Sequence, residues 1–178
     1  ACPASSRTDR NRPVTRQHRR IWGRLTDVTA PAALDVDALF RRHLADHGEI
    51  LEALDEVHAQ AWRAVDPGLL ELCRLRVAVL MGVETTADSA LVDEGRARAV
   101  DSWPTSPALS DLERTCLELT EQWVIDVASI SDDQAGALVD ALGPEGAMDF
   151  VNGLLVVEQR LRLASMWSTL FAEEADDD

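Results

Sequence analysis

The residues best suited to chemistry lie on one unusually apolar segment. Residues 67–82 are apolar on nearly every face of a helix, apart from Glu71, Arg74 and Arg76. A charged side chain enclosed among apolar neighbours needs a partner or a functional reason to be there. Glu71 could therefore act as a general acid or base in an apolar pocket. An ion pair with Arg74, Arg76 or Arg162 is the structural alternative.

A second polar group follows directly and contains Glu84, Thr86 and Asp88. These side chains could line a pocket beside the apolar segment. They also stand where a helix is expected to begin, from about Thr86 to Val100. Acidic residues are common at helix starts because they accept hydrogen bonds from unpaired backbone N–H groups. Helix capping is the favoured interpretation, and a pocket role is the alternative.

Histidines and tryptophans supply the remaining candidates. His58 shares a helical stripe with Trp62 and could face a pocket, although a place in the core or at a subunit interface is the favoured alternative. Trp62 and Trp123 are the tryptophans expected to line a ligand pocket. His43 and His47 have the spacing of two metal ligands on one helical face. No third ligand stands at a convincing distance, so no metal site is predicted.

The three cysteines, Cys2, Cys73 and Cys116, are odd in number and far apart in the sequence. This spacing predicts neither a disulfide framework nor a clustered metal site. Cys73 and Cys116 lie inside apolar helical patterns, which favours buried and unreactive thiols.

The elements that position these residues are predicted to be helices throughout. Apolar residues recur at threes and fours, and no alternating strand pattern is present, so the fold class is all-α, a single-domain bundle of about six to seven helices. Ser110 with Glu113, and Ser131 with Gln134, form capping-box patterns. The expected helices cover residues 35–48, 49–64, 67–82, 86–100, 110–128, 131–143 and 144–171.

Composition predicts one domain with a tail at each end. A chain of 178 residues, 46% of them hydrophobic, can bury one substantial core. We expect a basic, disordered arm and linker at residues 1–33, a helical domain at 34–172 and an acidic tail at 173–178. The net charge is −15, and residues 1–24 hold seven arginines against Asp9 alone, which leaves about −21 for the remainder. Such an acidic body repels phosphate, so nucleic acid is not expected as a partner.

No stretch approaches the roughly 18 to 20 apolar residues that a membrane span needs, and the first residues contain no apolar block of the signal-peptide kind. The sequence therefore predicts a cytoplasmic protein with no membrane partner. It contains no glycine-rich phosphate loop, and we expect no cofactor.

Residues 71–82 resemble the helix that precedes the active site in the alkylhydroperoxidase D and carboxymuconolactone decarboxylase family. That helix reads approximately Glu-Leu-x-Arg-Leu-Arg-x-Ala-x-Leu-x-Gly, and this chain has Glu-Leu-Cys-Arg-Leu-Arg-Val-Ala-Val-Leu-Met-Gly. The second half of the chain is similar to the family's second half, so the resemblance covers about residues 34–170. In the last helix, where the family often shows Asn-x-x-Asn-Arg, this chain has Glu158-Gln-Arg-Leu-Arg162 and keeps only the final arginine.

The chain departs from the family at the redox motif. In the family a Cys-x-x-Cys follows the helix and a histidine stands four residues later; here Val83 and Thr86 replace the cysteines and Ala90 replaces the histidine. Valine cannot be a nucleophile, and threonine would need an adjacent base. The departures imply that the family's thiol peroxidase chemistry is absent.

The resemblance then implies a non-redox small-molecule enzyme, working by proton transfer, decarboxylation or isomerisation, or a ligand binder. The alternatives are a catalytically inactive homologue kept for assembly and, least favoured, a residual hydroperoxide reductase using Cys73 or Cys116. Family members are trimers or hexamers, which implies a homo-oligomer. The expected catalytic residues are Glu71, Arg74, Thr86 and Asp88, and the expected ligand-binding residues are His58, Trp62, Arg76, Val83, Glu84, Ala90, Trp123, Glu158 and Arg162.

Overall fold

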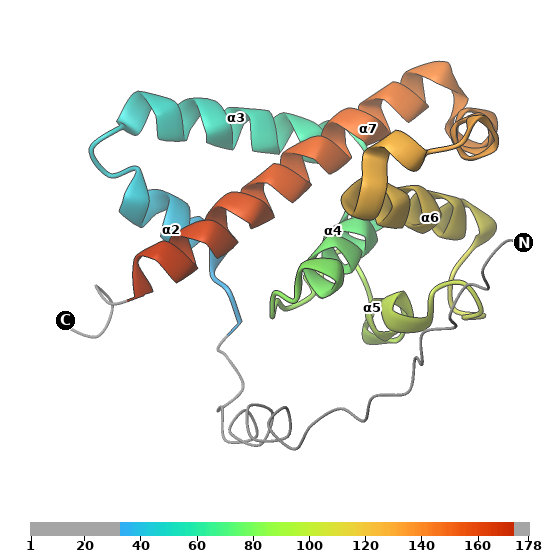
Figure 1. The fold of residues 1–178 in the computed structure, drawn as a ribbon, viewed down its shortest axis with the longest axis horizontal. Helices are drawn as coiled ribbons and strands as arrows, with labels where there is room; N and C mark the ends of the chain where they lie inside the picture. Colours follow the sequence, from blue (N-terminus) through green and yellow to red (C-terminus); the bar gives the residue numbers. More distant parts are fainter. Residues whose placement is uncertain (1–32, 173–178) are drawn as a thin grey trace, which may run out of the picture. The chain divides into compact units, whose positions relative to one another are not determined.

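The computed structural model describes residues 33–172, and all regular structure in that part of the chain is helical (Figure 1). The predicted all-α class is confirmed. The predicted acidic tail, and the predicted basic arm up to residue 32, lie outside the described residues. The helices are α2 (Val36–His43), α3 (Gly48–Ala64), α4 (Pro67–Met81), α5 (Glu94–Ala99), α6 (Asp111–Asp126) and α7 (Asp132–Leu170), with short 3-10 turns at Val100–Ser102 and Val127–Ser129.

Three helices begin directly after residues that cap them. The side chain of Asp66 accepts a hydrogen bond from the backbone N–H of Leu69, and Pro67 occupies the first turn of α4. Both predicted capping boxes are present, Ser110 with Glu113 at α6 and Ser131 with Gln134 at α7. The predicted end of the first helix near Gly48 is wrong, because α2 ends at His43 and a turn precedes α3.

The last helix is bent where the sequence predicts a break. Gly143 has φ 74°, outside the helical region, and Pro144 resumes the helix directly after it. Only glycine adopts such a positive φ at little cost, so this residue sets the kink. The two predicted helices, 131–143 and 144–171, are the two arms of α7.

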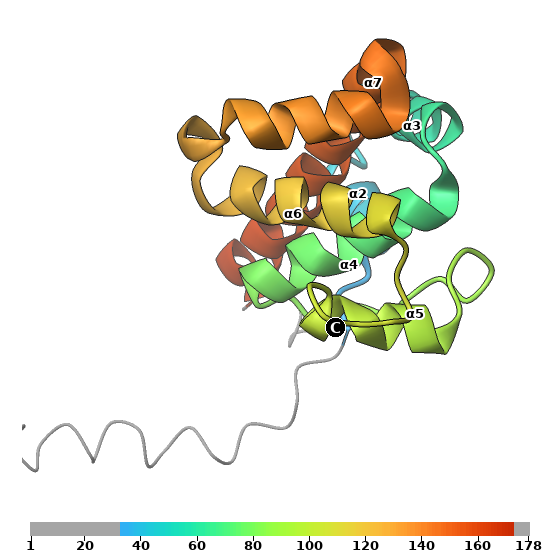
Figure 2. The same ribbon diagram turned by 90° about the vertical axis from the view of Figure 1, so that its right-hand side faces the viewer.

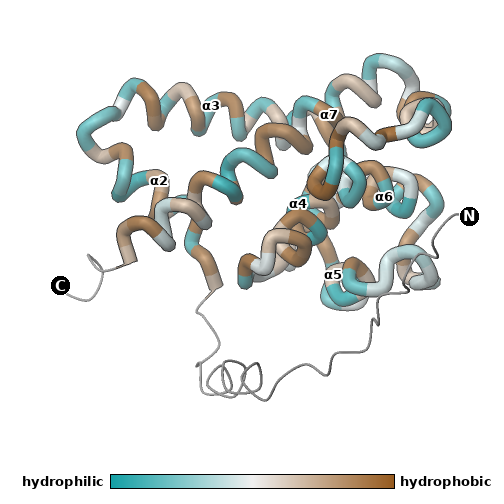
Figure 3. The backbone as a smooth tube through the Cα atoms, in the orientation of Figure 1, coloured by the Kyte–Doolittle hydropathy of each residue, from teal (hydrophilic) through white to brown (hydrophobic). Residues whose placement is uncertain are grey.

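Helix α4 is the centre of the fold. It contacts α3, α5, α6 and α7, and its predominantly apolar residues are brown in Figure 3. In Figure 2, α6 lies between the first arm of α7 and α4, while α5 lies on the other side of α4. The second arm of α7 also packs closely against the end of α3: a Cβ on Gly153 would lie 3.0 Å from Cγ2 of Val65, so the Val65 side chain would have to shift slightly.

The first half of the predicted helix 86–100 is wrong. Residues 83–93 form a loop, and α5 begins only at Glu94, where the side chain of Asp93 accepts from the N–H of Arg96. Side chains of α4 use the loop's backbone groups: Arg74 Nη2 donates to the carbonyl of Thr86 (2.7 Å), and the N–H of Asp88 donates to Glu71 (2.9 Å). These tertiary contacts replace the hydrogen bonds that a helix would make here.

Among residues 33–172, no helix combines the length and the apolar character needed to cross a lipid bilayer.

Candidate ligand-binding site

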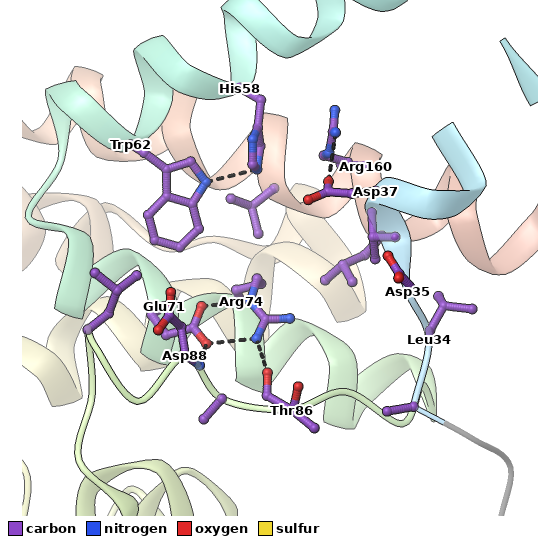
Figure 4. A pocket seen from close by; sticks show the side chains of 16 residues that line it. Leu34, Asp35, Asp37, His58, Trp62, Glu71, Arg74, Thr86, Asp88 and Arg160 are labelled. Carbon is purple, nitrogen blue, oxygen red and sulfur yellow. Dashed lines mark hydrogen bonds and ion pairs between the residues drawn. The ribbon is translucent and has the colours of Figure 1, made fainter. Parts of the chain in front are cut away.

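A pocket of about 670 Å³ lies between α3, α4, the second arm of α7, the start of α2 and the loop 83–93 (Figure 4). A volume of this size is typical of small-molecule sites. Its polar lining comes from Asp35, Asp37, His58, Glu71, Arg74, Thr86, Asp88 and Arg160, and its larger apolar lining residues are Leu34, Val36, Trp62, Leu91, Val157 and Leu161. Six residues that the sequence analysis singled out line this one pocket: His58, Trp62, Glu71, Arg74, Thr86 and Asp88.

Glu71 and Arg74 form a two-pronged ion pair on the floor of the pocket. Nε of Arg74 donates to Oε2 of Glu71 (2.6 Å), and Nη2 donates to Oε1 (2.7 Å). The Glu71 side chain is only 2% exposed and that of Arg74 16%. The ion-pair alternative for Glu71 is thereby confirmed for Arg74. Because both carboxylate oxygens are occupied, Glu71 is poorly placed to act as a free base.

The same ion pair fastens the loop 83–93 as a wall of the pocket. Nη1 of Arg74 donates to the Thr85 hydroxyl (2.7 Å), in addition to the bond from Nη2 to the Thr86 carbonyl. Oε1 of Glu71 accepts the backbone N–H of Asp88. The pocket wall is therefore held by charge-assisted hydrogen bonds to a buried pair, which are stronger than bonds between neutral groups.

His58 and Trp62 extend from α3 into the pocket from the opposite side (Figure 4). The indole N–H of Trp62 donates to Nε2 of His58 at 2.8 Å. Indole nitrogen is only a donor, so Nε2 must be unprotonated and Nδ1 carries the proton of the neutral ring. Burial lowers the pKa of His58, and the positive charge of Arg160 lowers it further. His58 is therefore neutral at neutral pH.

Arg160 is a site residue that the sequence analysis missed. It lies on α7 and is 9% exposed; its Nη2 donates to both Asp37 and Asp55 at 2.9 Å. Its guanidinium carbon lies 4.1 Å from the centre of the Phe40 ring. The hydrogen bond from Arg160 is the main cause that lowers the pKa of Asp37. The only sequence signal was its spacing, because Arg160 stands three positions after Val157 and directly before Leu161, and both of these apolar residues line the pocket too.

Four residues predicted to bind ligand lie outside this pocket. Arg76 pairs with Glu121 on α6 (2.8 Å), which also accepts from the indole N–H of Trp103 (2.8 Å). Glu158 accepts from Trp123 (2.9 Å) and from Arg162 (2.7 Å). Arg76, Trp123, Glu158 and Arg162 therefore do not line this pocket. For Arg76 the reason is helical geometry. Two positions correspond to about 200° of rotation, so Arg76 lies on the far side of α4 from Arg74.

Val83, Glu84 and Ala90 were also predicted to bind ligand, and they too lie outside the pocket lining. They belong to the loop, where the carbonyl of Glu84 accepts the N–H of Leu34 (2.8 Å) and the N–H of Ala90 donates to Oδ1 of Asp88 (2.8 Å). They lie in the same loop as Thr86 and Asp88.

Cys73 and Cys116 are free thiols with no exposed surface. Burial raises the pKa of Cys73 to about 12 and raises that of Cys116 as well. The charge of one thiolate would raise the pKa of the other, so the two residues are neighbours in space although distant in sequence. Reactive thiols need the opposite conditions, namely exposure and a lowered pKa.

No cluster of three or more potential metal-ligating side chains occurs in the described residues. Comparison with known proteins finds no matching family model, no matching curated protein and no matching solved structure.

Proposed function

We propose that this chain is a non-redox protein of the carboxymuconolactone decarboxylase type that binds a small molecule in the pocket between α3, α4 and α7. The observation that carries the proposal is the pocket itself, whose floor is the Glu71–Arg74 pair of the helix that resembles the family. Because that pair also fastens the loop wall, the pocket is formed before any ligand enters. A preformed site avoids the entropic cost of ordering its walls on binding.

The chemistry that this site supports best is proton transfer without a cofactor, as in a lyase or isomerase. His58 is a neutral base, and Asp37 and Asp55 lie close enough to favour its protonated form electrostatically. Its Nε2 is occupied by Trp62 until a ligand displaces the indole N–H. A proton taken at Nε2 would then be stabilised by these two carboxylates, against the larger opposing effects of burial and the positive charge of Arg160.

Thiol peroxidase chemistry is not part of the proposal. The support is the burial of Cys73 and Cys116 and their raised pKa values, which leave almost no thiolate at neutral pH. Assayed with an organic hydroperoxide and a dithiol reductant, the protein should show no turnover above background. Turnover that disappears in Cys73→Ser would contradict this part of the proposal.

We also propose self-association. Met148, Leu155 and Met166 are exposed by 61%, 42% and 46%, and their spacing places them on one face of α7. Exposed apolar side chains on one helical face, here set among the polar residues Asn152, Gln159 and Arg162, suit a contact between subunits, which supports a homo-oligomer such as a trimer or hexamer. Light scattering should give a mass that is a multiple of the 19.5 kDa chain. Leu155→Glu should lower that mass, and a monomeric wild type would contradict the proposal.

The binding proposal is tested by native mass spectrometry of the purified protein, followed by a fragment screen. Ala87 lines the pocket, so Ala87→Trp should fill it and abolish binding of any co-purified molecule or fragment. Ala108→Trp, at an exposed position outside the pocket lining, is the matched control and should bind as the wild type does. Equal binding by both variants, or no binding by the wild type, would contradict the proposal.

A further inference from the structure

We infer that the pocket selects a small organic cation, a protonated amine carried on an apolar body. This inference rests on the proposed binding function and adds the chemical class of the ligand. It follows from the balance of charge around the cavity, from the way in which both arginines are already used, and from the aromatic wall.

The pocket lining carries more negative than positive charge. Its ionisable groups are the four carboxylates of Asp35, Asp37, Glu71 and Asp88, against the two guanidinium groups of Arg74 and Arg160, a difference of two negative charges. A smaller pocket next to it adds one group of each sign, Arg41 and Asp55, and leaves the difference unchanged.

Both arginines are neutralised by partners within the fold. Four of the five N–H groups of Arg74 are engaged, by Glu71, the Thr85 hydroxyl and the Thr86 carbonyl. Arg160 uses Nη2 on Asp37 and Asp55 and lies against the Phe40 ring. The buried Nε of Arg160 has no hydrogen-bond partner among the described residues, but two carboxylates compensate the charge of this arginine, so little net positive charge is left to receive an anionic ligand.

Three exposed aspartates, by contrast, each have one carboxylate oxygen without a hydrogen bond from the described residues. Asp35, Asp37 and Asp88 each use only Oδ1 for hydrogen bonds within the described residues, to Ala38 N–H, Arg160 and Ala90 N–H respectively. Figure 4 shows Asp35 and Asp37 on the α2 side of the pocket and Asp88 on the opposite side, beside Glu71. Carboxylate groups therefore border the pocket on both sides.

The aromatic wall suits the same class of ligand. Trp62 lines the pocket with its indole held by the hydrogen bond to His58, and an indole face attracts cations. His58 itself is neutral and adds no opposing charge. Val157, Leu91 and Leu161 provide apolar surface for the rest of the molecule.

The test compares three probes of similar shape that differ in charge: 2-phenylethylammonium, 2-phenylethanol and phenylacetate. Binding to the full chain is measured by isothermal titration calorimetry at low and high salt. The cation should bind most tightly and the anion most weakly, and added salt should reduce this difference because it screens the carboxylates.

Charge-removing variants locate the effect in the pocket. Asp35→Asn and Asp88→Asn retain the side-chain oxygen that accepts the backbone hydrogen bond but lose the charge, so each should weaken cation binding by about two- to fivefold. Asp140→Asn, at an exposed position on α7 outside the pocket, makes the same change in net charge and should have no effect.

Three outcomes would overturn the inference. If 2-phenylethanol or phenylacetate binds as tightly as the amine, and Ala87→Trp abolishes that binding, the binding function stands and the cation inference fails. If the amine binds equally well to Ala87→Trp, the acidic surface and not the pocket holds it. If no probe and no screened fragment binds the wild type, the proposed function fails, and the inference fails with it.

Discussion

The two sides of helix α4 carry similar ion pairs in different surroundings. On the pocket side, Glu71 and Arg74 pair within the helix, and their side chains are 2% and 16% exposed. On the closed side, Arg76 pairs with Glu121 of α6, and these side chains are 13% and 30% exposed. The pocket-side pair borders a cavity and holds a loop, whereas the closed-side pair joins two helices and also meets Trp103.

The comparison shows that a charged pair in an apolar helix does not by itself mark a functional site. Both pairs satisfy the charge that burial would otherwise leave uncompensated. What distinguishes the pocket side is the set of neighbours that α3, α7 and the loop 83–93 bring to it. The distinction can be sharpened by removing equivalent groups from each side.

The largest expected difference comes from removing the arginines. Arg74→Met leaves Glu71 buried without its cation, so the free energy of unfolding should fall by about 3–5 kcal/mol. Arg76→Met should cost only about 1–2 kcal/mol, because water reaches Glu121 and Trp103 still donates to it. Urea denaturation of the two variants measures both values.

Hydrogen exchange gives an independent check on the arginine variants. The loop 83–93 should lose protection in Arg74→Met but not in Arg76→Met, because only Arg74 binds the loop. The double variant Glu71→Gln/Arg74→Met should be more stable than Arg74→Met, since it no longer buries an unpaired charge. Equal losses of stability in the two single variants would show that the two sides are equivalent.

The hydrogen bonds of Trp123 and Trp62 should differ by a smaller amount. Trp123→Phe removes the N–H that donates to the buried carboxylate of Glu158, which should cost about 1.5–3 kcal/mol. Trp62→Phe removes a bond to a neutral imidazole and should cost about 0.5–1.5 kcal/mol. Thermal and urea unfolding measure both, and a larger loss in Trp62→Phe would reverse the expected order.

The smallest effect is the pH dependence of stability that His58 contributes on the pocket side. The pKa of His58 is lowered in the folded protein from an unfolded value near 6.5, so the unfolded chain binds more protons between the two pKa values. The stability associated with neutral His58 is therefore present above about pH 6.5 and is lost as the pH falls through the folded pKa.

His58→Gln should reduce this acid-side loss of stability, because glutamine keeps a hydrogen-bond acceptor but does not titrate. The measurement is the free energy of unfolding at pH 5 and pH 7.5 for the wild type and the variant. Trp62→Phe, which removes the donor to the unprotonated Nε2, should raise the pKa of His58 in an NMR titration. Identical pH dependence in wild type and His58→Gln would contradict the assignment of a lowered pKa.

Local signals were sufficient for most helices but not for the loop 83–93. Asp66, Ser110 and Ser131 cap helices where the sequence predicts, because a cap is a contact between residues three positions apart. The sequence predicts a helix start near Thr86 and Asp88. Hydrogen bonds from side chains of α4 to the backbone hold these residues in a loop instead. Propensity is a weak signal when buried charges offer the backbone other partners.

Part of the candidate site could also be predicted from the sequence, because the contact concerned is local. Glu71 and Arg74 lie three positions apart on one helical face, so their pairing was among the alternatives that the sequence allowed. Arg160 was missed because its partner Asp37 is 123 positions away, and Arg162, its neighbour on α7, was favoured by the family pattern.

The sequence by itself determined the helical class, the kink at Gly143 and the polar residues that α4 carries, because these depend on periodicity, capping and backbone geometry over a few residues. Only the tertiary structure decided which of those residues meet. It placed Glu71 and Arg74 beside His58, Trp62 and Arg160 around one cavity, and it enclosed Arg76 on the opposite side. Such contacts depend on how helices that are distant in the sequence pack against one another. That packing is determined by all the side chains of the core together.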